Sequence, residues 1–347
     1  MHLTELVVIV ALMGTGLKID RPFSLKIWQA PFRLVSITML LSIAAVAAIG
    51  MFVFQWDIAS SMLLAAVLAP TDPVLAADVQ VDGPNKGEQD DIRFALTGEA
   101  GMNDGMAFTW LAIALAFTID NTSGRLIEWF LYDVLFRVGV GVVIGLLVGR
   151  LVVYLFFHLP EKYGKKHVRD GLVALSCTLI VYGATELAHG YGFIAVFVSV
   201  ITIRNYEREH KYHAKLHAFT GQIECILLAI LLVLFGGSLV NGILGDLTWP
   251  LVLGGVAFLL LVRPLAGYVA LSGLSMPRRA KAAVSFFGIK GIGSFFYLAF
   301  ALEEVEFVFQ KEVWSLTVFV VLVSILIHGL SAPTVMKKLS VNDKAET

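Results

Sequence analysis

Long apolar runs recur along nearly the whole chain, and they leave few choices of fold. A run of about 20 apolar residues suffices for a helix to cross the hydrocarbon core of a bilayer. Of the 347 residues, 58% are apolar and only 15% are charged, whereas soluble globular chains are about 45–50% apolar and about 25% charged. We therefore predict an all-α integral membrane protein. Its roughly eleven transmembrane segments are 3–19, 32–54, 57–80, 92–119, 127–157, 168–187, 190–203, 214–237, 248–274, 280–302 and 312–335.

The basic residues predict the orientation of these segments. They gather in alternate connections, while the intervening connections are mostly neutral or acidic. The positive-inside rule places basic connections in the cytoplasm. We therefore expect residue 1 outside and the C-terminus in the cytoplasm. The basic connections are 18–33, 86–93, 162–169, 204–215, 278–281 and 337–344.

Two of the predicted segments contain residues that interrupt a helix. Pro70, Asp72 and Pro73 lie within the third segment, and Gly288 and Gly291 lie within the tenth. Non-helical backbone at membrane depth persists only where protein or a water-filled cavity satisfies it. A pair of interrupted helices in corresponding halves indicates a transporter site near the bilayer midplane. Because the two segments cross in opposite directions, segments two to four and nine to eleven are expected to form inverted repeats.

The fourth segment carries an unusual polar group. Glu99, Asn103 and Asp104 fall within six residues of an otherwise apolar run, although an ionised group in hydrocarbon costs at least several kcal/mol. Spacing of four places Glu99 and Asn103 on one helix face, with Asp104 beside Asn103. Thr71 and the carbonyls freed at the first break add neutral oxygens. Together with the Asp104 carboxylate, they form a ligand set for a hard monovalent cation such as Na⁺.

The Asp104 carboxylate can hold a proton or a cation, but not both. One site with mutually exclusive occupants, exposed to each side in turn, gives obligatory exchange. Glu99 and Lys290 have opposite charges, and we predict that they form a structural pair whose disruption costs about 3–5 kcal/mol. We expect Arg263 to be an inter-helix charge partner, and Asp72 to offset the positive ends of the half-helices. His328 has no predicted role.

Three motifs carry a resemblance to a known family. They are Ala-Pro-Thr-Asp-Pro-Val-Leu-Ala at 69–76, Glu-Ala-Gly-Met-Asn-Asp-Gly at 99–105 and Gly-Ile-Lys-Gly-Ile-Gly-Ser at 288–294. The chain resembles, over essentially its whole length, the prokaryotic sodium/proton antiporters of the monovalent cation:proton antiporter-1 family. The resemblance implies the sodium/proton antiporter fold, with two discontinuous helices that cross, and a homodimer.

The resemblance also implies roles for individual residues. The aspartate matching Asp104 binds the transported ion or proton, helped by the threonine matching Thr71. The asparagine matching Asn103 accompanies electroneutral exchange. The glutamate matching Glu99 pairs with a basic residue of the second broken helix, which here is Lys290.

The chain departs from the family pattern in three places. Ala100 stands where most members have a serine that contributes a hydroxyl to the ion site, so we include this position in the candidate site. Lys290 stands where most have an arginine, which keeps the charge but loses the bidentate fork. Eleven segments are fewer than the 13 of the family, and the third segment here matches the fifth there. We therefore expect an N-terminally short member.

These observations lead to a division of the chain and to a predicted function. We expect electroneutral exchange of Na⁺ or Li⁺ for H⁺ across a bacterial or archaeal cytoplasmic membrane, in sodium export and pH homeostasis, with no cofactor and no nucleic-acid partner. Open alternatives are K⁺/H⁺ exchange by the same mechanism, a non-transporting truncated remnant and a cation channel. The predicted segments contain no pairing of a nucleophile with a base at membrane depth that would suggest an enzyme. The expected divisions are an N-terminal scaffold helix (1–31), core repeat one (32–119), scaffold and dimer-interface helices (120–247), core repeat two (248–335) and a short cytoplasmic tail (336–347).

Overall fold

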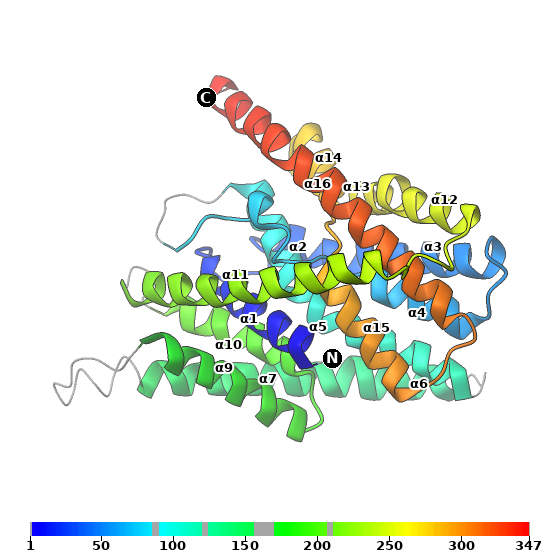
Figure 1. Cartoon of the computed structure of the whole chain (residues 1–347). Helices are drawn as coiled ribbons and strands as arrows, with labels where there is room; N and C mark the ends of the chain where they lie inside the picture. The colour runs from blue at the N-terminus through cyan, green and yellow to red at the C-terminus, as the bar shows by residue number, and fades with distance from the viewer. Residues whose placement is uncertain (1, 85–89, 120–123, 156–169, 207–210, 347) are drawn as a thin grey trace.

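A computed structural model describes residues 2–84, 90–119, 124–155, 170–206 and 211–346, which form helices and no strand. Figure 1 shows their arrangement. In chain order the elements are α1 (His2–Lys18), α2 (Gln29–Arg33), the π-helical η1 (Leu34–Thr38), α3 (Met39–Phe52), α4 (Ile58–Leu68), the 3-10 turn η2 (Ala77–Val79), α5 (Asp91–Ile119), α6 (Gly124–Trp129), the π-helical η3 (Phe130–Arg137), α7 (Val138–Val153), α9 (Asp170–Leu187), α10 (Gly192–Asn205), α11 (Lys211–Val240), α12 (Trp249–Ala257), the π-helical η5 (Phe258–Val262), α13 (Arg263–Ala270), α14 (Arg278–Phe286), α15 (Ile292–Glu304) and α16 (Gln310–Glu346).

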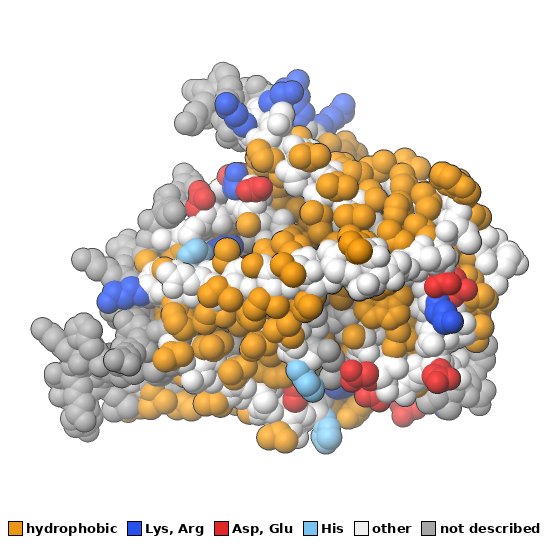
Figure 2. Space-filling view, in the orientation of Figure 1, with side chains coloured by type: hydrophobic (Ala, Val, Ile, Leu, Met, Phe, Trp, Pro, Cys, Tyr) orange, Lys and Arg blue, Asp and Glu red, His pale blue; other side chains and the backbone are white. Residues whose placement is uncertain are grey.

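The surface is that of a membrane protein. By length and hydropathy, five continuous helical stretches of the described residues qualify as membrane spans: 29–52, 124–153, 214–240, 249–270 and 310–339. Large apolar side chains such as Val233 and Leu330 are exposed. Figure 2 shows apolar side chains over most of one face, with charged side chains gathered toward its borders, among them Lys and Arg side chains at the top, near the C-terminal part of α16. Such a surface is suited to lipid and unsuited to water.

Each predicted segment corresponds to one helix or to a set of consecutive helical pieces. The second, fifth and ninth segments contain the π-helical stretches η1, η3 and η5, which the apolar pattern does not reveal. The stretch η5 ends just before Arg263 and Pro264, where a proline would otherwise clash with the preceding turn. The last segment is longer than predicted, since residues 336–346 of the expected tail continue α16 as helix. Lys86, Arg208 and the basic residues between 162 and 169 lie outside the described residues.

Two chain breaks cross each other in the middle of the molecule. Helix α4, whose N-terminus is capped by the Asp57 side chain accepting from Ser60 N, ends at Leu68, and non-helical backbone follows. The backbone between α14 and α15, residues 287–291, is also non-helical. The two breaks are joined directly, because Asp72 N donates to the Ile289 carbonyl at 2.8 Å. The protein therefore has the inverted-repeat architecture with two discontinuous crossing helices.

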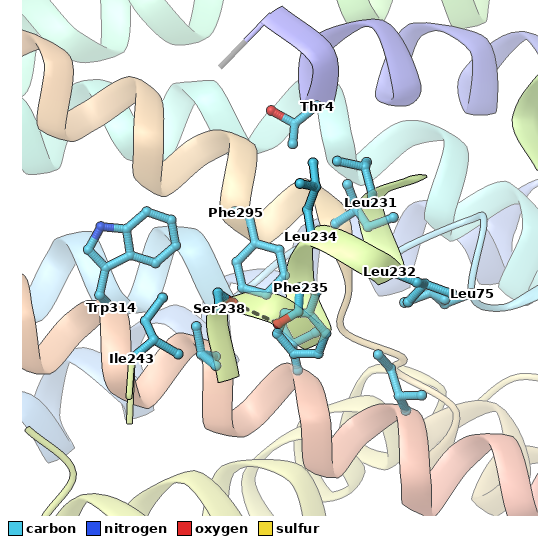
Figure 3. A pocket seen from close by; sticks show the side chains of 14 residues that line it. Thr4, Leu75, Leu231, Leu232, Leu234, Phe235, Ser238, Ile243, Phe295 and Trp314 are labelled. Carbon is cyan, nitrogen blue, oxygen red and sulfur yellow. Dashed lines mark hydrogen bonds between the residues drawn. The ribbon is translucent and has the colours of Figure 1, made fainter. Parts of the chain in front are cut away.

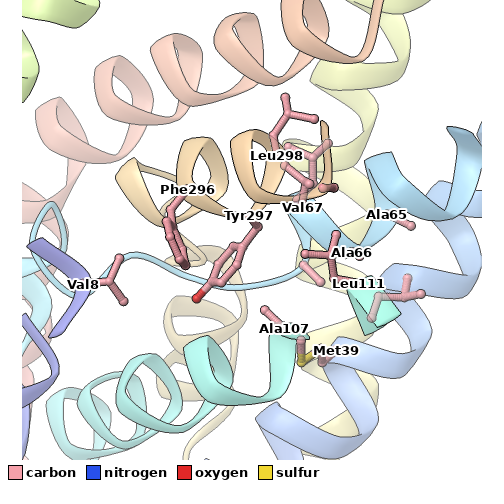
Figure 4. Packing of buried hydrophobic residues seen from close by; sticks show 14 of the residues in the cluster. Val8, Met39, Ala65, Ala66, Val67, Ala107, Leu111, Phe296, Tyr297 and Leu298 are labelled. Carbon is pink, nitrogen blue, oxygen red and sulfur yellow. The ribbon is translucent and has the colours of Figure 1, made fainter. Parts of the chain in front are cut away.

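Helix α5 lies across both breaks and carries the polar group of the fourth segment. Around the crossing, the core is apolar and tightly packed, as Figure 4 shows for Val67, Ala107, Leu111 and Leu298. On the other side of α5 lies α10, which in turn packs against α7. The helices α7 and α10 approach very closely at Gly145, where a Cβ atom would lie 2.7 Å from the Ala195 carbonyl oxygen. Small residues permit this kind of contact between membrane helices.

We predict that Gly145→Ala lowers stability. The added methyl group would meet backbone atoms of α10, and overpacking of this kind costs about 1–3 kcal/mol. Thermal unfolding in detergent should show a fall in Tm of several degrees. Gly139→Ala on the same segment is the matched control, because a Cβ atom there would meet nothing within 4 Å. Equal Tm values for the two variants would contradict the close contact.

Candidate functional site

Helix α5 brings its polar side chains to the point where the two breaks cross. Glu99, Asn103 and Asp104 are all buried, and the Asp104 residue is only 1% exposed. Thr71, in the first break, is also buried, and its hydroxyl accepts a hydrogen bond from Asn103 Nδ2 at 2.7 Å. The structure thus places Asn103 and Thr71 in contact, with Asp104 as the next residue of α5, at the crossing.

Two buried oxygen atoms at this point remain without partners. Within the described part of the chain, neither Asn103 Oδ1 nor Asp104 Oδ2 receives a hydrogen bond. Buried polar atoms are nearly always satisfied, and a group that is not calls for an explanation. A carboxylate oxygen and an amide oxygen on neighbouring residues are the ligand types that a hard cation prefers. Ala100, one turn earlier on α5, is buried and contributes a methyl group instead of an oxygen.

Asp72 holds the two breaks together. Its Oδ1 accepts from Val74 N and Leu75 N at 2.8 and 2.9 Å, and its Oδ2 accepts from Ile292 N and Gly293 N at 2.6 and 3.4 Å. The last two donors belong to the free N-terminus of α15, where a negative charge is stabilised. Both oxygen atoms of Asp72 are therefore engaged in joining the breaks.

Two glycines make this approach possible. A Cβ atom on Gly291 would lie 2.4 Å from Asp72 Oδ2, and one on Gly288 would lie 2.2 Å from Arg263 Nε. Each position needs a residue without a side chain because a charged group passes directly beside the backbone. The glycines of the second break thus admit Asp72 on one side and Arg263 on the other.

Lys290 satisfies the carbonyls that the first break frees. Its Nζ donates to the Ala69 and Pro70 carbonyl oxygens at 2.8 and 2.9 Å. The side chain is fully buried, and its Nζ lies 5.3 Å from the centroid of the Phe258 ring. Helix α4 ends at Leu68. In a continued helix these carbonyls would accept from residues 73 and 74, but Pro73 has no N–H and Val74 N donates to Asp72. A cation from the opposite repeat takes the place of the missing N–H groups.

The predicted pair of Glu99 with Lys290 is wrong. Glu99 instead pairs with Arg263 of α13, whose Nη2 lies 2.7 and 2.8 Å from the two carboxylate oxygens. The inter-helix charge partner expected for Arg263 is therefore Glu99. The physical reason is that the Lys290 ammonium is already used by two backbone carbonyls, and Gly288 leaves room for Arg263 to reach α5. Two buried cations were available in the sequence, and spacing alone did not distinguish them.

Three further buried side chains at the crossing were not predicted as parts of the site. The Tyr297 hydroxyl lies 3.0 Å from Asp104 Oδ1 and 2.9 Å from the Asp104 carbonyl oxygen. Lys290 N donates to Ser324 Oγ at 2.8 Å, and Ser324 Oγ lies 3.0 Å from His328 Nδ1. His328 Nε2 lies 3.1 Å from the Phe286 carbonyl oxygen.

His328 therefore holds both ends of the second break. Each ring nitrogen lies within hydrogen-bond distance of a carbonyl oxygen, Nδ1 at 3.0 Å from that of Ser324 and Nε2 at 3.1 Å from that of Phe286, and whichever nitrogen carries the proton donates to its carbonyl. This chain connects α16 to the end of α14 through Phe286 and to Lys290 through Ser324. A polar residue within an apolar run was the only sequence signal for any of these contacts.

The buried charges at the crossing do not balance. Asp72, Glu99 and Asp104 are opposed by Arg263 and Lys290, so among the described buried residues of the crossing three negative charges face two positive ones. Asp72 accepts four N–H groups and Glu99 has an arginine. The remaining negative charge therefore falls to Asp104, whose Oδ2 is the oxygen without a partner.

A pocket of about 180 Å³ lies beside the crossing but does not form the candidate site. Figure 3 shows it bordered by α11, with Phe235, Phe295 and Trp314 among the residues that line it. Its lining is almost entirely apolar and its hydroxyls are those of Thr4 and Ser238. It offers no charged ligand, whereas the crossing does.

We predict that Glu99→Gln lowers stability by about 3–5 kcal/mol, because it leaves Arg263 buried without its counter-charge. The double variant Glu99→Gln/Arg263→Gln should recover at least half of the lost stability. Thermal unfolding in detergent measures both effects, with the exposed Arg150→Gln as control. If the losses of Glu99→Gln and Arg263→Gln, each measured alone, simply add in the double variant, the pair is not energetically coupled.

Comparisons with known proteins agree with this geometry. Residues 2–338 match the family model described as "Sodium/hydrogen exchanger, transmembrane". The sodium proton antiporter MjNhaP1 of Methanocaldococcus jannaschii superposes with a TM-score of 0.74 at 17% identity, covering 97% of this chain and 85% of that one. This likeness confirms the predicted fold.

Curated relatives cover the chain at low identity. The Na⁺/H⁺ antiporter NhaH of Halobacillus aidingensis is 25% identical over 86% of this chain and 73% of that protein. A Na⁺/H⁺ antiporter of Saccharomyces cerevisiae is 24% identical over 95% of this chain. The chain spans only 37% of the length of that yeast protein. With nearly its whole length matched by the family model, the chain belongs to the sodium/hydrogen exchanger family.

Proposed function

We propose that this protein is a secondary transporter, and not an enzyme, that exchanges Na⁺ or Li⁺ for H⁺ across a cytoplasmic membrane. One observation supports it above the others. Asp104 presents a buried carboxylate oxygen without a partner, at the crossing of two broken helices and beside an equally unpartnered amide oxygen of Asn103. Such a group at membrane depth is a functional-site hypothesis by default.

The charge balance supports exchange of one ion for one proton. The five buried charges at the crossing leave a single negative charge when Asp104 is ionised. Either one H⁺ or one monovalent cation on Asp104 neutralises this negative charge. Binding of both would leave one positive charge buried without a counter-charge, which is costly away from water. Asn103 contributes an oxygen but no second charge. The exchange is therefore proposed to be electroneutral.

In the proposed site, Asp104 and Thr71 bind the cation, together with the Asn103 amide oxygen. Thr71 Oγ1 already accepts from Asn103 Nδ2, and its second lone pair remains as a further ligand. Ala100 lies beside Asp104 without adding a ligand. Glu99, Arg263 and Lys290 keep the surroundings fixed without touching the ion.

Alternating access is proposed to involve movement of the two repeats, 32–119 and 248–335, against a scaffold formed by 1–31 and 120–247. The repeats are tied together at the crossing by Asp72 and Lys290, which favours movement as one body. We also propose that the scaffold forms a homodimer, that residue 1 lies outside and that the C-terminus lies in the cytoplasm, as the basic connections predict.

K⁺ is a second candidate for the exported ion. The K⁺/H⁺ antiporter NhaP2 of a Shewanella strain is 25% identical over 90% of this chain, which is the same identity as that of the Na⁺/H⁺ antiporter NhaH. Sequence identity therefore does not separate the two ions. Compared with the family pattern, which has a serine at this position, Ala100 leaves the site with one fewer hydroxyl. The cation is then held by fewer fixed oxygen ligands.

We predict that Asp104→Asn abolishes exchange. Asparagine has a similar shape but carries no negative charge for a proton or a cation to neutralise. Everted vesicles or proteoliposomes with a pH-sensitive dye measure the pH change on addition of cation. The exposed Glu304→Gln, an equivalent change of carboxylate to amide on α15, is the control and should transport as wild type. Exchange by Asp104→Asn at more than about a tenth of the wild-type rate would overturn the assignment of the carboxylate.

We further predict that exchange by the wild type is independent of the membrane potential. Since each turnover moves one charge in each direction, clamping the potential with K⁺ and valinomycin should leave the Na⁺-driven or Li⁺-driven pH change unaltered. Testing Na⁺ and Li⁺ in this way, and K⁺ with a clamp based on another permeant ion, identifies the transported cation. A rate that follows the imposed potential would rule out one-for-one exchange and favour a channel or an unequal stoichiometry.

A further inference from the structure

Tyr297 is a side chain that lies within hydrogen-bond distance of the Asp104 carboxylate and carries a proton to donate. It extends from α15, one turn after the second break, into the space next to α5, as Figure 4 shows. Its hydroxyl lies 3.0 Å from Asp104 Oδ1 and 2.9 Å from the Asp104 carbonyl oxygen. The side chain is fully buried. A Cβ atom on Gly293 would lie 3.3 Å from Asp104 Oδ1 and 3.4 Å from Tyr297 Cε2, so this glycine leaves room for both groups.

The two carboxylate oxygens of Asp104 are consequently unequal. Oδ1 accepts from the Tyr297 hydroxyl, whereas Oδ2 has no partner among the described residues. The phenol therefore fixes the orientation of the carboxylate and directs Oδ2 to the proton or the cation. A carboxylate that could rotate freely would offer either oxygen, with no fixed relation to Asn103 and Thr71.

We propose that Tyr297 is a positioning residue that makes Asp104 favour the cation over the proton. The inference rests on the proposed exchange of a cation for a proton at Asp104. The phenol donates to an ionised carboxylate, and Asp104 stays ionised when it holds a cation. A protonated carboxyl group is a much weaker acceptor, so the hydrogen bond from Tyr297 stabilises the cation-bound state and the ion-free state more than the protonated state.

The second acceptor explains how the phenol adapts when Asp104 is protonated. A phenol has one proton to donate, and the Asp104 carbonyl oxygen lies as close as Oδ1. When the carboxyl group takes up a proton, the phenolic O–H can turn to the carbonyl oxygen without any movement of its own oxygen. The Tyr297 side chain therefore stays in place through the cycle, while its hydrogen bond changes from one acceptor to the other.

Tyr297 also packs in an aromatic cluster. The test must separate this structural role of the ring from the proposed effect of the hydroxyl on Asp104. Its ring lies edge-on to Phe108 with the centroids 5.3 Å apart, and next to Phe296 at 5.6 Å. Tyr297→Phe keeps the ring and removes only the hydroxyl. The matched control is Tyr191→Phe, because Tyr191 is also buried and its hydroxyl also donates to an aspartate, Asp133 Oδ1, at 3.0 Å. Asp133 lies in η3, away from the crossing.

The decisive measurement is the KM for Na⁺ at two pH values in proteoliposomes. Because Tyr297→Phe lets the proton compete more strongly, KM at pH 7 should rise roughly tenfold over the wild type, the size expected for one hydrogen bond to a charged group. At pH 9, where few protons compete, KM should return to within about twofold of the wild type. Tyr191→Phe should match the wild type at both pH values.

A defect of the same size at both pH values would show that Tyr297 acts through structure alone, and an unchanged KM would show that it does not act on Asp104; either overturns the inference. Absence of exchange in the wild type would instead refute the proposed function.

If the wild type shows no exchange, the role of Tyr297 is still testable by infrared spectroscopy of the purified protein. The carboxyl stretching band that disappears in Asp104→Asn reports protonation of this residue directly. In Tyr297→Phe, the pH at which this band loses half its intensity should rise by about one unit. No change in that pH would overturn the proposal.

Discussion

The need to satisfy backbone groups without water is the constraint on which this structure depends. Pro70 and the second-break glycines interrupt two helices at membrane depth, and every N–H and carbonyl freed there must find a partner in the protein. The two repeats solve this for each other. Lys290 of one repeat donates to the carbonyls of Ala69 and Pro70, and Asp72 of the other accepts the N–H groups at the start of α15. Each break is thus stable only because the other lies against it.

This mutual dependence also explains why the charges are distributed as they are. A lysine that serves two carbonyls is unavailable to Glu99, so a second cation, Arg263, is needed on α13. Asp72 is fully used by four N–H groups. Once the structural requirements of the breaks are met, Asp104 alone retains an unpartnered negative oxygen. The proposed ion site is what remains after the crossing has stabilised itself.

Much of this could be predicted from the sequence, for identifiable reasons. Apolar runs of bilayer length predicted each span, and prolines and glycines inside two of them predicted the breaks, because both signals are local. The contact of Asn103 with Thr71 followed from placing the polar group of α5 at the first break. The partner of Glu99 did not follow, since the choice between Lys290 and Arg263 depends on which side chain can reach across Gly288. That is a property of three segments in space.

The same limit applies to Tyr297, Ser324 and His328. In an apolar run, a tyrosine, a serine or a histidine reads as packing, and only the crossing shows which backbone or carboxylate atom each one meets. The π-helical stretches also escape an apolar pattern, because one extra residue in a turn leaves the hydropathy unchanged. Their presence in both segments that precede a broken helix, at η1 and η5, is itself a repeat at the level of backbone. The backbone therefore keeps a symmetry that the amino-acid sequence does not show. The reason is that similar backbone geometry at both breaks needs only small residues and prolines at suitable depths, and the surrounding side chains can differ.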